Sequence, residues 1–201
     1  MERIKFIQHK GAEILYLDFS ACEIAAIFPL IAQAKTIIAS RPPKSLLTLT
    51  NVTDTRQNVV YKVGADQQPS ILYRFEPAEG LALNGIVYHA DGYLIVIGGP
   101  KLYKITTGDP AKMTEVELAE PIPGMDGMVF LPDGRLAVVS NSQSKVVALE
   151  SNDGWNSASV SATASFEGQA TTAAVADGDV YVVQPHFNDQ EPPVIERVTF
   201  R

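Results

Sequence analysis

The chain has 201 residues, of which 46% are hydrophobic and 19% are charged, and its formal net charge is −7. This composition excludes a disordered chain, and the acidic balance argues against binding to a nucleic-acid backbone. The single cysteine, Cys22, excludes an internal disulfide and a zinc cluster of cysteines. The charged N-terminus lacks a signal-peptide core, and the most apolar stretch, 24–38, is too short to span a bilayer. We therefore expect a cytoplasmic protein that binds neither nucleic acid nor a membrane.

The first fifty residues predict a β-β-α-β segment. A turn that ends at Gly11 separates two alternating runs. Ser20 and Glu23 form a capping box, because their side chains can satisfy backbone N–H groups at a helix start. Pro29 removes one helical hydrogen bond, so the helix is either kinked there or begins there. We expect strands at 3–8 and 13–19, a helix over 24–38 and a strand at 45–50.

Beyond about Asn51, a repeated unit of two strands and an Asp-Gly turn replaces the helical pattern. Asp-Gly suits a tight hairpin because both residues tolerate positive φ. Copies begin at residues 84, 126 and 171, so the period is 42 to 45 residues, which is typical of β-propeller blades. Outer strands are expected at 101–105 and 145–149, and at 58–63 for an earlier, truncated copy. The predicted fold is mainly β, with partial propeller blades of four antiparallel strands after the β-β-α-β segment.

The repeats resemble the senescence-marker-protein/gluconolactonase/LRE-like family of six-bladed propellers. The likeness lies in Leu83-Asn84-Gly85-Ile86, in Met125-Asp126-Gly127-Met128 and in the link Ser151-Asn152-Asp153-Gly154-Trp155. It covers about three and a half blades, and it implies a partial propeller domain over residues 56–201.

The first 55 residues resemble a different family, the small STAS-like proteins related to anti-sigma-factor antagonists. The likeness lies in residues 11–19 and 34–50 and covers the first half of such a domain. We therefore interpret the chain as a hybrid of a STAS-like half-domain, residues 1–55, and a partial propeller, residues 56–201. The sequence leaves open whether this hybrid is a natural fusion, a recombinant, a fragment or an assembly artefact.

The propeller resemblance implies a divalent metal, Ca²⁺ or Zn²⁺, in the central channel, and hydrolysis of lactones or small esters. Asn84 and Asp126 match two of the family's metal ligands, and Asp126 also matches the general base that activates water. The ligand set is incomplete, because Ca²⁺ takes roughly six to eight oxygens and catalytic zinc about three protein ligands. An alternative is that both residues only shape the entry to their strands.

The other candidate groups carry weaker signals. His89 next to the Asp91-Gly92 turn is typical of a surface turn residue, whereas His186 is a further candidate ligand. Cys22 at a helix start is typical of a small buried residue, and Trp155 is expected to anchor the link between two blades.

Three functions from different classes follow from these patterns. The first is a metal-dependent hydrolase of a small lactone or ester, and the second is a non-catalytic binding module. The third is a hybrid or fragment without activity. A partial propeller also has open edges, which favour pairing with another chain. Either a homodimer closes the propeller, or the N-terminal segment covers one edge.

Overall fold

The computed structural model describes residues 4–9, 12–17, 33, 36–37, 50–63, 68–187 and 191–201. The chain divides into two compact units, Met1–Thr48 and Leu49–Arg201. Among the described residues, no helix has the length and apolar character that a membrane crossing requires.

The first unit contains the predicted hairpin. Strand β1 (Ile4–His9) pairs antiparallel with β2 (Ala12–Leu17). Three residues of the predicted helix are described, namely Gln33, Thr36 and Ile37, and all three are helical. The rest of that helix, Cys22 and the predicted strand before Thr50 lie outside the described residues, so the STAS-like assignment stays a prediction.

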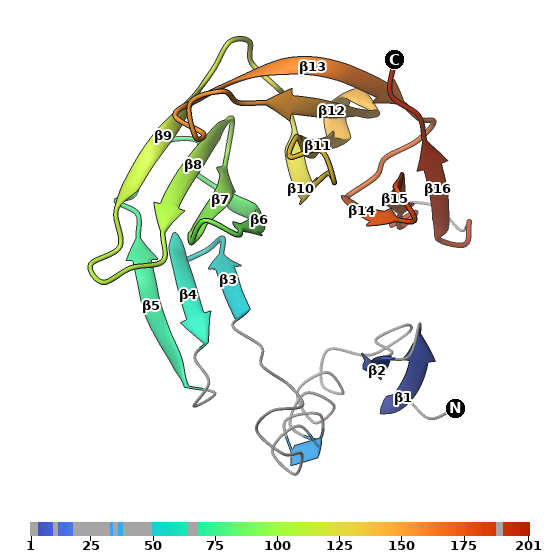
Figure 1. Ribbon diagram of the computed structural model, residues 1–201, viewed down its shortest axis with the longest axis horizontal. Coiled ribbons are helices and arrows are strands. Elements are labelled where there is room, and N and C mark those ends of the chain that lie inside the picture. Colours follow the sequence, from blue (N-terminus) through green and yellow to red (C-terminus); the bar gives the residue numbers. More distant parts are fainter. Residues whose placement is uncertain are drawn as a thin grey trace. The chain divides into compact units, whose positions relative to one another are not determined.

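The strands of the second unit form four antiparallel groups, which we call blades 1 to 4 (Figure 1), and a short parallel pairing of β13 (Ser157–Ser165) with β9 (Met113–Leu118) joins blades 2 and 3 into one eight-stranded sheet. Blade 1 comprises β3 (Thr50–Asp54), β4 (Val59–Val63) and β5 (Pro69–Arg74). Blade 2 comprises β6 (Leu83–His89), β7 (Tyr93–Gly98), β8 (Lys101–Thr106) and β9 (Met113–Leu118). Blade 3 comprises β10 (Met125–Phe130), β11 (Leu136–Ser140), β12 (Lys145–Glu150) and β13 (Ser157–Ser165). Blade 4 comprises β14 (Thr172–Ala176), β15 (Asp179–Gln184) and β16 (Val194–Val198).

The mainly β fold with propeller-type blades is thus confirmed, and blades of three, four, four and three strands amount to three and a half four-stranded blades. The expected outer strands differ in position. β8 and β12 are third strands, because β9 and β13 pair outside them. β4 is the central strand of blade 1, where it pairs with both β3 and β5. The β3–β4 pairing also places residues 50–54 in the second unit, so the predicted boundary after residue 55 falls inside a hairpin.

The first strands of the blades lie side by side in chain order, as β3, β6, β10 and β14. The Thr53 hydroxyl donates to the Asn84 carbonyl oxygen at 2.7 Å, and the Gly127 N–H donates to the Thr171 carbonyl oxygen at 2.8 Å. These bonds join residues that lie 31 and 44 positions apart in the sequence. This arrangement forms the inner rim of a propeller.

The three Asp-Gly hairpin turns show part of the predicted conformation, in which both turn residues have positive φ. Gly92, Gly134 and Gly178 all have positive φ, between +84° and +88°. Only the last turn also has a positive φ at its aspartate, +53° at Asp177, and only there are the paired strand residues separated by two residues. The first two turns are longer, so the strained conformation is confined to their glycines.

Three apolar clusters fill the spaces between successive blades. Strand β7 shows how the clusters form, since its two faces pack on different neighbours. Ile95 and Ile97 belong to the cluster shared with blade 3, whereas Leu94 and Val96 belong to the cluster shared with blade 1. Such a strand is buried on both faces, which explains its continuous apolar sequence.

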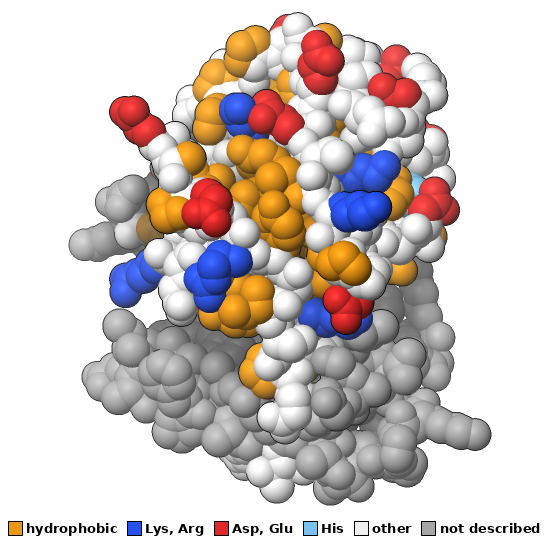
Figure 2. Space-filling model, turned by 90° about the vertical axis from the view of Figure 1, so that its left-hand side faces the viewer, with side chains coloured by type: hydrophobic (Ala, Val, Ile, Leu, Met, Phe, Trp, Pro, Cys, Tyr) orange, Lys and Arg blue, Asp and Glu red, His pale blue; other side chains and the backbone are white. Residues whose placement is uncertain are grey.

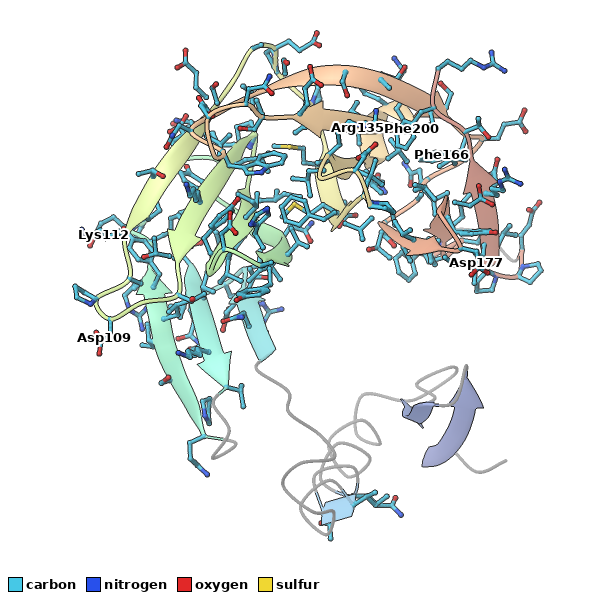
Figure 3. The ribbon with its side chains drawn as sticks, viewed as in Figure 1. Asp109, Lys112, Arg135, Phe166, Asp177 and Phe200 are labelled. Carbon is cyan, nitrogen blue, oxygen red and sulfur yellow. The ribbon has the colours of Figure 1, made fainter. Side chains whose placement is uncertain are left out.

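The C-terminal residues fasten blade 4 to blade 3. The backbone of Arg201 exchanges two hydrogen bonds with Thr163 of β13, at 2.9 and 3.2 Å. Arg135 and Phe200 lie together beside blade 3 (Figure 3), and the Arg135 guanidinium is 5.9 Å from the centre of the Phe200 ring. The chain end therefore continues the outer edge of the preceding blade.

Candidate functional site

The two predicted site residues occupy the same place in successive blades. Asn84 is the second residue of β6, and Asp126 is the second residue of β10. Each follows an apolar strand residue and precedes a glycine, and each lies where the register with the next strand shifts by one residue. A β-bulge of this kind re-aims side chains at a strand end. Both repeats therefore present a polar side chain from the same local irregularity.

The glycine after each site residue allows close approach to the next inner strand. A Cβ on Gly85 would contact the Asp126 carbonyl oxygen and would lie 2.9 Å from the Ile97 Cδ1. A Cβ on Gly127 would lie 2.6 Å from the Thr172 Cα and 2.7 Å from the Thr171 carbonyl oxygen. Real Cβ atoms do not approach backbone so closely, so the side-by-side packing of the inner strands requires glycine at both positions.

Asn84 and Asp126 lie on neighbouring inner strands, β6 and β10, and the Asn84 side chain is close enough to the Asp126 carboxylate to influence its pKa. Asn84 is exposed, whereas Asp126 is half-buried. Burial raises the pKa of the Asp126 carboxyl above its usual value, and the Asn84 side chain lowers it by a smaller amount. The pair is thus a partly desolvated carboxylate beside an amide.

The donor atoms of this pair suit a hard cation. A carboxylate and an amide carbonyl supply only oxygen, which favours Ca²⁺ over Zn²⁺. Within the part of the chain that the structure describes, no group of three or more His, Cys, Asp or Glu side chains could hold a metal. Two oxygens fall short of a full Ca²⁺ shell, so water, substrate or another chain would have to supply the rest.

A cavity of about 230 Å³ lies at the same end of the inner strands. Thr171, which lines it, accepts the Gly127 N–H, and Asn141, which also lines it, donates its backbone N–H to Gly124 at 2.8 Å. The lining therefore flanks the segment that carries Asp126. The complete lining is Asn141, Gly168, Gln169, Thr171, Pro185, His186 and Phe187.

Of these lining residues, the sequence analysis named only His186, as a further candidate ligand, and it did not single out Asn141, Gln169 or Phe187. These residues lie in three separate connections, so no local motif marks them. Thr171 could have been found, because it begins the third repeat as Asn84 and Asp126 begin the first two.

His89 lies at the other end of β6, away from the Asn84 end. Its ring stacks on Tyr93 with 4.4 Å between centroids and meets Phe130 edge-on at 5.0 Å. Its Nδ1 accepts the Asp91 backbone N–H at 3.2 Å. His89 is thus half-buried in an aromatic cluster, and this corrects the expectation of a surface turn residue. Trp155, 4% exposed, packs edge-on against Phe130 and anchors the link as expected.

A second cavity of about 360 Å³ lies beside this cluster. It is lined by aromatic rings and by charged side chains, among them Asp91, Glu150 and the Asp133–Arg135 ion pair. The loop at its rim is held by Asp153, whose carboxylate accepts hydrogen bonds from Ser151 and Ser157. Those bonds lower the pKa of Asp153 to about 2.

No protein-family model matches the sequence, and no curated protein matches it either. Solved structures do match. The allergen Mala s 1 of Malassezia sympodialis has 16% identity and a TM-score of 0.57, over 71% of this chain and 50% of its own. A streptogramin B lyase has 15% identity and a TM-score of 0.53, over 78% of this chain and 52% of its own. Virginiamycin B lyase from Staphylococcus aureus has 14% identity and a TM-score of 0.55, over 99% and 62%.

These structures are propeller-like, so the comparison agrees with the repeat pattern and the observed blades. The chain spans about half the length of the first two structures. At such low identities the likeness establishes the fold, and the chemistry has to be argued from this chain's own residues.

Proposed function

We propose that this protein hydrolyses a small lactone or ester at the Asn84–Asp126 pair. The observation that supports the proposal is the proximity of the two side chains, because the same position of two successive repeats supplies a partly buried carboxylate and an amide beside it. Two of the similar structures are lyases by name, so the propeller fold alone does not select hydrolysis.

In this proposal Asp126 acts as a general base. A carboxylate with a raised pKa is a stronger base, and it takes a proton from the attacking water. The water oxygen bonds to the acyl carbon, the acyl C–O bond breaks, and the proton passes to the departing alkoxide. In the same proposal Asn84, on the neighbouring strand, positions the Asp126 carboxylate. The neighbouring cavity of about 230 Å³ has room for a small uncharged substrate.

A divalent cation belongs to the same proposal. Asn84 and Asp126 would hold it through their side-chain oxygens, and Ca²⁺ fits these donors best. Once bound, such an ion supplies charge stabilisation for the acyl oxygen. The STAS-like identity of residues 1–55 and a cytoplasmic location are further proposals, supported by the sequence alone.

The test compares the protein with Asp126→Ala, and uses Asp91→Ala as the matched control. Asp91 is an exposed aspartate in the turn after β6, with 77% of its side chain exposed. We expect lactone hydrolysis in the presence of Ca²⁺ to fall by about 100-fold or more in Asp126→Ala, as for loss of a general base. The control should retain the activity. A protein that hydrolyses no lactone faster than Asp126→Ala contradicts the proposal.

The same proteins test the cation. Ca²⁺ at about 100 times its dissociation constant should add roughly 2.7 kcal/mol to the free energy of unfolding. We expect this gain in the protein and in Asp91→Ala, and not in Asp126→Ala. Mg²⁺ and Zn²⁺ are measured alongside, and a larger gain with Zn²⁺ would contradict the assignment of Ca²⁺.

A non-catalytic binding module is the second candidate, and the cavity of about 360 Å³ beside Trp155 favours it. That cavity lies at the end of the strands away from Asp126 and carries aromatic rings with charged groups, which suits recognition of a polar ligand. This function predicts that small-molecule ligands change the fluorescence of Trp155 equally in the protein and in Asp126→Ala. Fluorescence changes that require Asp126 would contradict it.

A further inference from the structure

Blade 4 exposes an apolar face that continues the blade-to-blade packing of the unit. Tyr181 and Val183 of β15 lie on the opposite face from Val180 and Val182, which pack toward blade 3. The cross-strand partner of Val183 is Ile195 of β16, whose exposure is 72%. We call Tyr181, Val183 and Ile195 the open face of blade 4.

Equivalent positions in the preceding blades are covered. Counting from the turn glycine, Tyr181 and Val183 correspond to Ala137 and Val139 of blade 3, both 0% exposed. They correspond equally to Ile95 and Ile97 of blade 2, which are also 0% exposed. In both blades the next blade provides the cover. The open face of blade 4 is therefore the packing surface for a following blade.

Blade 1 exposes the complementary kind of face. Val52, Tyr61 and Ile71 are cross-strand neighbours in one row over β3, β4 and β5. Val52 is 46% exposed and Ile71 is 50% exposed, and we call this row the open face of blade 1. Val60, next to Tyr61, packs in the cluster shared with blade 2, so the row faces away from blade 2. It is the surface that a preceding blade would cover.

Hydrophobic side chains are visible on the side of the molecule where β5 lies (Figure 2). Three of the six large hydrophobic residues that are exposed in the described part of the chain belong to the two open faces, namely Val52, Ile71 and Ile195. Exposed apolar groups that gather on two sheet faces indicate interaction surfaces.

We propose that two copies of this chain associate, with the open face of blade 4 of each copy packed on the open face of blade 1 of the other. Between successive blades, a face like the open face of blade 4 packs on a face like the open face of blade 1. Each open face is therefore complementary to the other one and not to a copy of itself. Made twice around a two-fold axis, this contact closes and leaves no open face.

Closure of the ring also affects the Asn84–Asp126 site, and this part of the inference rests on the proposed function. A closed ring places two Asn84–Asp126 pairs around one channel, and the partner copy then supplies oxygen donors that a single copy lacks. The dimer itself does not depend on that chemistry, because its faces contain neither Asn84 nor Asp126.

The test measures the mass of the full 201-residue chain by sedimentation equilibrium across the micromolar range. We expect about twice 21.7 kDa. Ile195→Arg and Ile71→Arg each change one open face, and each should raise the dissociation constant by about 100-fold or more, because the contact would bury an unpaired charge. Tyr88→Arg is the matched control, because Tyr88 is 54% exposed on an inner strand between two blades. It should leave the dissociation constant within about threefold of the original.

Both arginine variants replace side chains that are at least half exposed, so a single copy should fold with either. Near-ultraviolet circular dichroism of Trp155 checks this. A monomeric protein overturns the proposal. That outcome includes the case in which residues 1–48 of the same chain cover an open face. A dimer that only one of the two variants disrupts also overturns it, since that result indicates like faces packed together. Loss of lactonase activity in a protein that remains dimeric counts against the proposed function alone.

Discussion

Replacing Gly127 with alanine is expected to push two inner strands apart. The new Cβ would lie 2.6 Å from the Thr172 Cα and 2.7 Å from the Thr171 carbonyl oxygen, which are backbone atoms at the start of β14 and directly before it. The hydrogen bond from the Gly127 N–H to Thr171 would lengthen or break, at a cost of about 1 kcal/mol. Overpacking adds about 1–3 kcal/mol. The free energy of unfolding should therefore fall by about 2–4 kcal/mol.

Urea unfolding followed by the fluorescence of Trp155 measures this change. Trp155 is the single tryptophan, and it is buried in the cluster between blades 2 and 3, so it reports on the second unit. Gly108→Ala is the matched control, because a Cβ there meets no atom within 4 Å and its φ is not in the left-handed range. The control should stay within about 1 kcal/mol of the original protein. If both variants unfold with the same free energy, β10 and β14 do not approach closely, and the argument that places Asp126 also fails.

Three further predictions concern titration and packing. Asp126→Asn should raise the melting temperature at pH 7, because burial raises the pKa of the Asp126 carboxyl and its ionisation therefore destabilises the folded state. The gain should vanish below about pH 3.8, where the carboxyl is protonated in both the folded and the unfolded state. A gain that does not depend on pH would contradict this reasoning. Asp153→Asn should lower the melting temperature at pH 7, since hydrogen bonds to the ionised carboxylate lower the pKa of Asp153 to about 2. In melts at a series of pH values, the difference in melting temperature should shrink as the pH falls from about 4 to about 2. A difference that stays constant would indicate an effect of packing instead. Leu136→Ala, at a side chain with 0% exposure, should reduce the free energy of unfolding by about 2–5 kcal/mol, whereas Val194→Ala, at 42% exposure, should change it little in the same urea titration.

Much of the blade architecture was predictable because its signals are local. Each Asp-Gly turn lies between two apolar strands, and the period of 42 to 45 residues repeats that signal three times. The outermost strands were harder to predict. β13 reads SASVSATAS, with small and polar residues throughout, and its place is set by pairing with β12 on one edge and with β9 on the other. A strand held mainly by backbone pairing leaves little hydrophobic pattern to read.

The sequence by itself determined the repeat, the inner strands, and the equivalence of Asn84 and Asp126 at two strand starts, because turn chemistry and alternation act over a few residues. Only the tertiary structure decided that these side chains lie near each other, since 42 residues separate them and the packing of β6 against β10, with a bulge and a glycine in each strand, brings them together. The same holds for the cavity beside Asp126, whose lining comes from three connections distant in the chain. The open faces also follow only from the tertiary structure. The packing of blades 2 and 3 shows that the positions equivalent to Tyr181 and Val183 are covered by a following blade, and blade 4 has no such cover among the described residues.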